Sequence, residues 1–84
     1  ILGGRVIGSE GPVDQAQILA RDLEGSEWSA VTDSQGYWLF ENMPKNMIFE
    51  VSCMLGTSLY HPKSGRYIDL QKNEVEIDFL VGQP

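Results

Sequence analysis

The sequence predicts an all-β protein in which seven short strands form an antiparallel β-sandwich. Apolar residues recur at every second position through most of the chain, which is the period of strands that bury one face. Glycine, proline, aspartate and asparagine mark turns about every ten residues, as is typical of small sandwiches. No window shows the 3.6-residue apolar stripe of an amphipathic helix. These observations favour strands throughout.

Four strands are expected in the first half of the chain, over residues 4–8, 13–21, 28–32 and 37–41. The second strand begins at Val13, and we expect a bulge near Asp14 and Gln15, where the alternation shifts. Before the fourth strand, Asp33 to Gly36 predicts a tight turn in which Gly36 has a positive φ, because glycine lacks the Cβ that would clash there. The side chain of Asp33 is expected to bond the backbone of its own turn.

Three further strands are expected in the second half, over residues 49–53, 68–70 and 75–81. The last of them has the cleanest alternation in the chain, because every second residue from Val75 to Val81 is apolar and the acidic residues Glu76 and Asp78 separate the first three of them. Gly56 to Gly65 is expected to be the longest irregular stretch, and long loops of compact domains are often functional.

The inward faces of these strands define a predicted core that combines residues from all seven segments. Its members are Val6, Ala16, Ile18, Thr32, Trp38, Phe40, Phe49, Val51, Ile68, Leu70, Ile77 and Phe79. Cys53 alternates with apolar residues of the same strand. It is therefore expected to be a buried, inert thiol.

Length and charge restrict the class of protein. A chain of 84 residues is one domain, here residues 1–84. Its start without methionine or a signal-peptide pattern suggests a module excised from a longer protein, or a matured chain. No apolar run approaches the 18 residues of a membrane span, so no membrane insertion is expected. Twelve acidic and six basic residues give a net charge of −6, which repels a phosphate backbone and argues against nucleic acid as a partner.

Residues that could support catalysis or hold a metal are few. His61 is the only histidine, and its Tyr-His-Pro context supplies neither a nucleophile nor an orienting carboxylate. The single cysteine cannot form an internal disulfide or complete a metal site. The acidic stretch Asp22 to Glu27 could offer oxygen ligands to Ca²⁺, but it lacks the spacing of a calcium loop, and a solvated hairpin tip is the favoured interpretation. We expect no enzymatic activity and no cofactor, while calcium at this tip stays open.

Several stretches share their order and spacing with a known family. They are Gly4-Arg5-Val6, Gly11-Pro12-Val13 with Ala16 and Ile18, the run from Thr32 to Phe40, Met43-Pro44, the strand with Phe49 and Val51, and the strand from Val75 to Phe79. Together they resemble carboxypeptidase regulatory-like domains over nearly the whole chain. Gln15 stands where that family often has glycine, Met43 replaces leucine, and Lys45-Asn46 replaces Pro-Gly. Asparagine is the non-glycine residue that best tolerates a left-handed turn position, so the last change is mild.

This resemblance implies a prealbumin-like (transthyretin-like) fold, a seven-stranded antiparallel Greek-key β-sandwich, and it implies no catalysis. Such domains are accessory modules of peptidases, receptors, adhesins and secreted or phage structural proteins. We therefore expect a non-catalytic interaction module or rigid spacer at an extracellular, cell-envelope or virion surface. Its expected partners are another protein or further domains of its own parent protein.

The candidate binding surface consists of Tyr60, His61 and Tyr67, in and beside the Gly56 to Gly65 stretch. Exposed aromatic rings anchor protein interfaces or stack on sugar faces, although rings at such positions also cover the edge of a core. A carbohydrate-binding module that uses Tyr60 and Tyr67 is the alternative function.

Overall fold

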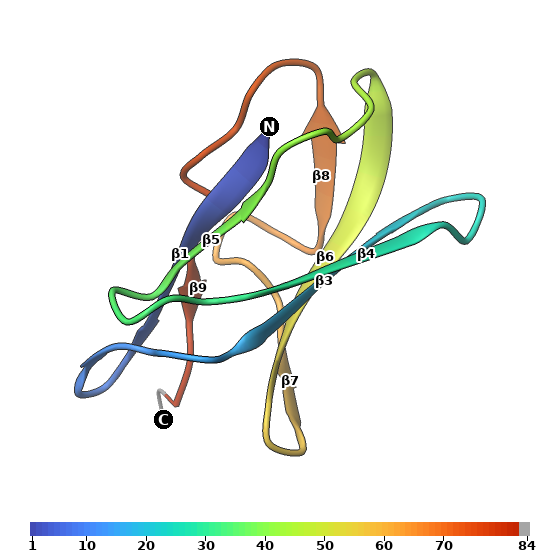
Figure 1. The fold of residues 1–84 in the computed structure, drawn as a ribbon. Helices are drawn as coiled ribbons and strands as arrows, with labels where there is room; N and C mark the ends of the chain where they lie inside the picture. Colours follow the sequence, from blue (N-terminus) through green and yellow to red (C-terminus); the bar gives the residue numbers. More distant parts are fainter. Residues whose placement is uncertain (83–84) are drawn as a thin grey trace.

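Two β-sheets make up the structure, and none of residues 1–82 is helical (Figure 1). These residues are the part of the chain that the computed structural model describes. The sheets face one another across a shared apolar interior, which gives a β-sandwich-like architecture. The predicted all-β class is thus confirmed, and it follows from the two-residue period of the sequence.

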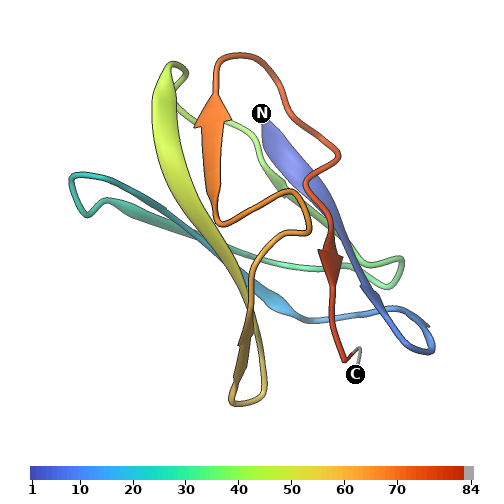
Figure 2. The same cartoon turned by 180° about the vertical axis from the view of Figure 1, so that it is seen from behind.

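The smaller sheet is built around β1 (Leu2–Gly8). On one side β1 pairs with β5 (Tyr37–Phe40) and with β2 (Gly11–Pro12), both antiparallel. Its other partner is β9 (Phe79–Leu80), which runs parallel to it. The first and last strands of the described chain therefore lie side by side and point the same way, as both views show (Figures 1 and 2).

The larger sheet runs in the order β4 (Glu27–Val31), β3 (Gln17–Asp22) and β6 (Met47–Leu55). Two short strands then pair with the same long strand. β7 (Ser58–Tyr60) pairs with residues 53–55 of β6, and β8 (Tyr67–Leu70) pairs with its residues 47–50. All these pairings are antiparallel.

The described residues form nine strands where the sequence predicts seven. The additional ones are β2 and β7, and β7 corrects the expectation of an irregular Gly56 to Gly65 stretch. Gly56 has a φ of 64° and turns the chain directly back, so that Ser58 to Tyr60 pair with β6. Alternation does not reveal this strand, because it lies at the edge of the sheet with Ser58 and Leu59 exposed.

The predicted strand over residues 75–81 is mostly wrong, because only Phe79–Leu80 form a regular strand. Leu2 is level with Glu74, and Val6 is level with Phe79. The last segment therefore takes five residue steps over a distance that β1 covers in four. The extra residue breaks the alternation. Val75 consequently points to solvent and is 58% exposed, while Ile77, Phe79 and Val81 remain buried as expected.

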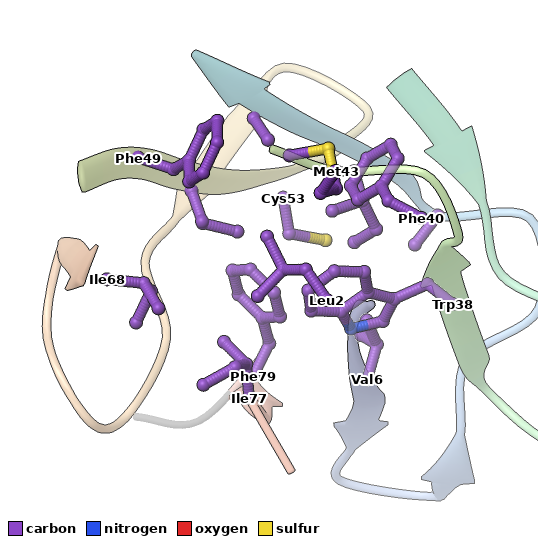
Figure 3. Packing of buried hydrophobic residues seen from close by; sticks show 14 of the residues in the cluster. Leu2, Val6, Trp38, Phe40, Met43, Phe49, Cys53, Ile68, Ile77 and Phe79 are labelled. Atoms are coloured by element: carbon purple, nitrogen blue, oxygen red, sulfur yellow. The ribbon is translucent and has the colours of Figure 1, made fainter. Parts of the chain in front are cut away.

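The twelve residues of the predicted core are all buried, and this part of the sequence interpretation is confirmed. Figure 3 shows Trp38, Phe79 and Leu2 meeting side chains from the opposite sheet, with Cys53 among them. The ring of Trp28 covers one side of the core and lies edge-on to Phe49, at a centroid distance of 5.4 Å. Burial of apolar side chains of this size stabilises the fold by about 1.5–3 kcal/mol each.

The left-handed conformation that the sequence predicts for Gly36 is confirmed. Gly36 has a φ of 83°, and a Cβ there would lie 2.6 Å from the carbonyl oxygen of Val6. Among the described residues, Gln15 and Asn46 are the two residues other than glycine with a positive φ, with values of 59° and 61°. The strain of an L-residue in this region is smallest for asparagine.

Gly4 serves a different purpose, the close approach of two backbone segments. A Cβ at this position would overlap the carbonyl oxygen of Ile77. Only glycine therefore lets β1 lie directly against residues 74–81, which completes the smaller sheet.

Candidate functional site

The three residues of the predicted binding surface do not form one surface. Tyr60 is level with Cys53 on the neighbouring strand, and Tyr67 is level with Glu50. Positions 50 and 53 point to opposite faces of β6, because side chains alternate along a strand. Tyr60 therefore points toward the core, whereas Tyr67 lies on the outer face of the larger sheet.

Tyr60 and His61 are half-buried and hold neighbouring backbone. The hydroxyl of Tyr60 accepts a hydrogen bond of 3.3 Å from the backbone N–H of Gly82, just after β9. The Nδ1 atom of His61 lies 3.4 Å from the carbonyl oxygen of Val51. Both side chains thus fasten the segment between β7 and β8 to its surroundings, and their contacts are structural.

Tyr67 is the exposed member of the set, with 57% of its surface accessible. The guanidinium carbon of Arg66 lies 5.7 Å from the centre of its ring, and Arg66 also forms an ion pair with Glu50. The hydrogen bond to Glu50, and then the charge of that carboxylate, raise the pKa of Arg66. On the adjoining strands β3 and β4, Arg21 and Glu27 form a second ion pair, with a nitrogen–oxygen distance of 2.7 Å. The outer face of the larger sheet thus has a band of alternating charge that ends at an exposed aromatic ring.

A second exposed ring, Tyr37, lies on the outer face of the smaller sheet and is 52% exposed. The guanidinium carbon of Arg5 lies 4.9 Å from its ring centre, and the Nε of Arg5 donates a 2.9 Å hydrogen bond to the carbonyl oxygen of Gln35. Sequence reasoning did not choose Tyr37. The available signal was its place between Gly36 and the inward-facing Trp38, which puts it on the outer side of β5.

A shallow hollow of about 320 Å³ lies beside Tyr37. It is also lined by Gly3, Leu39 and Val75, and the missing side chain of Gly3 opens it. A Cβ at Gly3 would contact Leu39 at 3.0 Å. A second hollow, of about 390 Å³, lies at the other end of β1, where Glu10 and Asp14 are its ionisable residues. Both hollows are open to solvent.

The acidic stretch Asp22 to Glu27 forms a hairpin tip between β3 and β4. Asp22 is buried, and its Oδ1 atom accepts hydrogen bonds of 2.9 Å from the backbone N–H groups of Glu24 and Ser26. This carboxylate therefore closes its own turn. Residues 1–82 contain no group of three or more His, Cys, Asp or Glu side chains placed to hold a metal ion.

Asp33 closes the next turn in the same way, as predicted. Its Oδ1 atom accepts hydrogen bonds of 2.9 and 3.0 Å from the backbone N–H groups of Gln35 and Tyr37. Such side-chain acceptors replace a backbone partner at tight turns. The carboxylate of Asp33 therefore stabilises the turn between β4 and β5, which connects the two sheets.

The thiol of Cys53 is buried in the core, as the alternation predicts. Burial raises its pKa from 9.0 to about 11, because an apolar environment disfavours the thiolate. The thiolate is the nucleophilic form of cysteine, so this side chain is chemically quiet at neutral pH.

Two further findings concern insertion into a membrane and similarity to known proteins. Within residues 1–82 no helix of sufficient length and apolar character to cross a membrane is found. Comparisons of the chain with family models, with curated proteins and with solved structures gave no match. The assignment of a function therefore rests on the geometry of this chain.

Proposed function

We propose that this chain is a non-catalytic module of a larger surface, secreted or virion protein, in which it acts as a rigid spacer and presents its outer faces to protein partners. The same proposal includes a prealbumin-like Greek-key sandwich of the carboxypeptidase regulatory-like type. Its partners are the adjoining domains of the parent protein or a separate protein.

One observation supports the spacer role above all others, namely the direction in which the chain enters and leaves the fold. In both views the amino-terminal end lies near the top of the molecule and the described carboxy-terminal end lies near the bottom (Figures 1 and 2). The molecule is elongated, with principal extents of 35, 21 and 19 Å. A module inserted into a longer chain in this way holds the domains on its two sides apart.

The family resemblance is supported by backbone conformation. Gln15 and Asn46 occupy two positions where the similar family has glycine, and both have positive φ. Such values are uncommon outside glycine and mark a conformation that the turn itself requires. The two departures from the family pattern thus keep the backbone geometry that glycine would provide.

The non-catalytic part of the proposal is supported by the contacts of five of the twelve acidic side chains. The carboxylates of Asp22, Asp33 and Asp78 accept hydrogen bonds from backbone N–H groups. Glu27 and Glu50 are paired with arginines. A general acid or base needs a free carboxyl group within reach of a substrate proton, and these groups are committed to the fold.

Spin labels on two exposed positions test the spacer role. Labels at Ile1→Cys and Leu80→Cys report the separation across the smaller sheet, and the buried Cys53 does not react in the folded protein. Leu80 is level with Ile7, so six strand steps of about 3.3 Å predict a separation of about 20 Å. A matched pair at Ile1→Cys and Lys72→Cys spans one end only and should give a shorter distance.

Pulsed dipolar spectroscopy should give a single narrow distance distribution for each pair. A distribution for the first pair as broad as that of the urea-unfolded chain would overturn the spacer role. The matched pair shows whether any broadening is confined to one end or extends over the whole molecule.

A carbohydrate-binding module is the second candidate, and it is favoured by the exposed ring of Tyr67. The face of the Tyr67 ring that Arg66 does not cover suits stacking on a sugar, and Arg66 beside it supplies hydrogen-bond donors. Binding on a glycan array that is lost in Tyr67→Ala and retained in Tyr37→Ala would support this candidate. Absence of binding by the unmodified chain would remove it.

A further inference from the structure

We propose that the module bears mechanical tension, and that β1 together with residues 74–81 forms the element that resists it. We name this pair of segments, residues 1–7 and 74–81, the terminal clamp. The inference rests on the proposed function, because tension reaches the clamp only through neighbouring parts of a longer protein. It adds a specific task, which is to hold two attached bodies together under load.

The two segments of the terminal clamp are parallel neighbours, and they contain the two ends of the described chain. β1 begins at Leu2 next to the amino terminus, and β9 ends at Leu80 next to the carboxy-terminal end. The ends of the clamp are therefore pulled in opposite directions along the strands when tension is applied through the chain (Figure 1). The two strands must slide past one another before anything else in the fold can open.

Hydrogen bonds along the full length of the clamp oppose this sliding. Besides the regular pairing of β1 with β9, they are Glu74 N–H to Ile1 O at 3.0 Å, Gly3 N–H to Glu74 O at 2.7 Å, Ile77 N–H to Gly3 O at 3.0 Å, Arg5 N–H to Asp78 Oδ1 at 3.1 Å and Val81 N–H to Ile7 O at 2.9 Å. Bonds of a parallel pair are evenly spaced along the strands. Sliding loads all of them together.

Two side-chain features keep the clamp continuous where its register shifts. Residues 74–79 contain one residue more than the stretch of β1 beside them, so the N–H of Arg5 has no backbone oxygen opposite it. A carboxylate oxygen of Asp78 accepts the hydrogen bond from this N–H instead. Gly4 lacks the Cβ that would overlap the carbonyl oxygen of Ile77. Both features serve the contact between the first and last segments.

The direction of pulling decides how strongly such a pair resists. When the strands slide, the bonds must break in one concerted step, so the barrier to forced unfolding is high. When the strands are peeled apart from one end, each bond breaks after the previous one and the barrier is low. Forced unfolding is governed by the unfolding rate, so the two geometries differ even at the same equilibrium stability.

Single-molecule force spectroscopy on the unmodified fold compares these two geometries. In the first, handles are attached at the amino and carboxy termini. In the second, they are attached at the amino terminus and at Lys72→Cys, which lies at the same end of the clamp because the amino group of Ile1 donates to Asn73. The first geometry should require a severalfold higher unfolding force. Equal forces in the two geometries would overturn the proposal.

A pair of matched variants tests whether the clamp itself sets the force. Asp78→Ala removes a carboxylate acceptor within the clamp, and Asp22→Ala removes one from the distant β3–β4 tip. Chemical unfolding measures the stability that each variant loses. Asp78→Ala should lower the end-to-end force by more than Asp22→Ala at equal loss of stability, and an equal effect of both would overturn the proposal. If either variant fails to fold, the comparison of geometries still decides.

Failure of the clamp can be distinguished from failure of the proposed function. A narrow distance distribution with equal forces would leave a rigid spacer without a load-bearing clamp. A broad distribution would remove both, because the labels at Ile1 and Leu80 lie in the terminal clamp itself.

Discussion

The carboxylate of Asp78 accepts a hydrogen bond from the backbone N–H of Arg5, 73 residues earlier in the chain, at 3.1 Å. This contact lies where β1 and the last segment of the chain are offset by one residue. A side-chain oxygen takes the place of the backbone oxygen that a regular ladder would supply, so a partly buried N–H keeps its partner. The first and last segments therefore stay joined through the shift in register.

Replacement of Asp78 should destabilise the fold through the N–H of Arg5. Asp78→Ala leaves that donor without its acceptor, and a loss of about 1–3 kcal/mol in the free energy of unfolding is expected. Asp78→Asn retains an amide oxygen at the same place and should recover most of the loss. Urea unfolding followed by tryptophan fluorescence gives both values.

Glu76→Ala is the matched control for this measurement, because Glu76 is an exposed acid in the same segment. Surface changes of this kind usually stay within about 0.5 kcal/mol. If Asp78→Ala is no more destabilising than Glu76→Ala, the bond to Arg5 does not contribute to stability.

A side chain at Gly4 should separate the two segments of the terminal clamp. The added Cβ of Gly4→Ala overlaps the carbonyl oxygen of Ile77, which is backbone and cannot rotate away. Overpacking of this kind typically costs about 1–3 kcal/mol, and backbone contact places Gly4→Ala at the upper end. Gly8→Ala is the control on the same strand, because its nearest neighbour is a methyl group of Val13 at 3.1 Å. A smaller loss for Gly4→Ala than for Gly8→Ala in the same unfolding assay would refute the steric argument.

The core could be predicted from sequence because it depends on local alternation. Phe49, Val51 and Cys53 share a face of one strand whatever its neighbours are, and the same holds for Trp38 and Phe40. The left-handed conformation of Gly36 was predictable for a similar reason, since the turn sequence Asp-Ser-Gln-Gly specifies it locally.

Features that depend on pairing between distant segments could not be predicted in this way. Val75 fits the alternation of its own segment, but the register with β1 shifts by one residue and leaves it exposed. Tyr60 and Tyr67 are close in the sequence, yet β7 and β8 meet β6 at positions of opposite parity and separate the two rings. Nearness in sequence therefore did not place these two rings on one surface, because strand register decides which face a residue occupies.

Trp38 should tolerate phenylalanine far better than alanine. Its ring packs edge-on against Phe40 and Phe79, at centroid distances of 5.8 and 5.9 Å, and its Nε1–H finds no hydrogen-bond partner among residues 1–82. Trp38→Ala removes the whole ring, and a loss of about 3–5 kcal/mol is expected. Trp38→Phe keeps most of the packing and also removes a buried donor whose desolvation costs about 1–3 kcal/mol.

These two terms oppose each other in Trp38→Phe, because the smaller ring leaves a cavity while the unpaired donor disappears. The net loss should therefore be less than half that of Trp38→Ala in the same chemical unfolding experiment. Phe40→Ala serves as a reference for the loss of a neighbouring ring that has no polar atom. If Trp38→Phe is as destabilising as Trp38→Ala, the ring of Trp38 is not accommodated as Figure 3 shows it.

The buried thiol of Cys53 should make stability depend on pH in the alkaline range. Its pKa is raised from 9.0 to about 11 because burial disfavours the thiolate. Above pH 9 the unfolded chain loses this proton while the folded protein retains it, so the unfolded state binds fewer protons and stability falls as pH rises. The stabilisation is fully present below pH 9 and is lost by about pH 11. A shift of two pKa units corresponds to about 3 kcal/mol at most.

Cys53→Val isolates this contribution, because valine fills a similar volume and does not titrate in that range. Urea unfolding of both proteins between pH 8 and 11 gives the free energy of unfolding at each pH, and tyrosine and lysine titrations contribute equally to both. The unmodified protein should lose stability more steeply than Cys53→Val across this window. Parallel curves would show that the thiol ionises as readily in the folded protein as in the unfolded chain, and they would contradict the prediction that burial in the core raises its pKa.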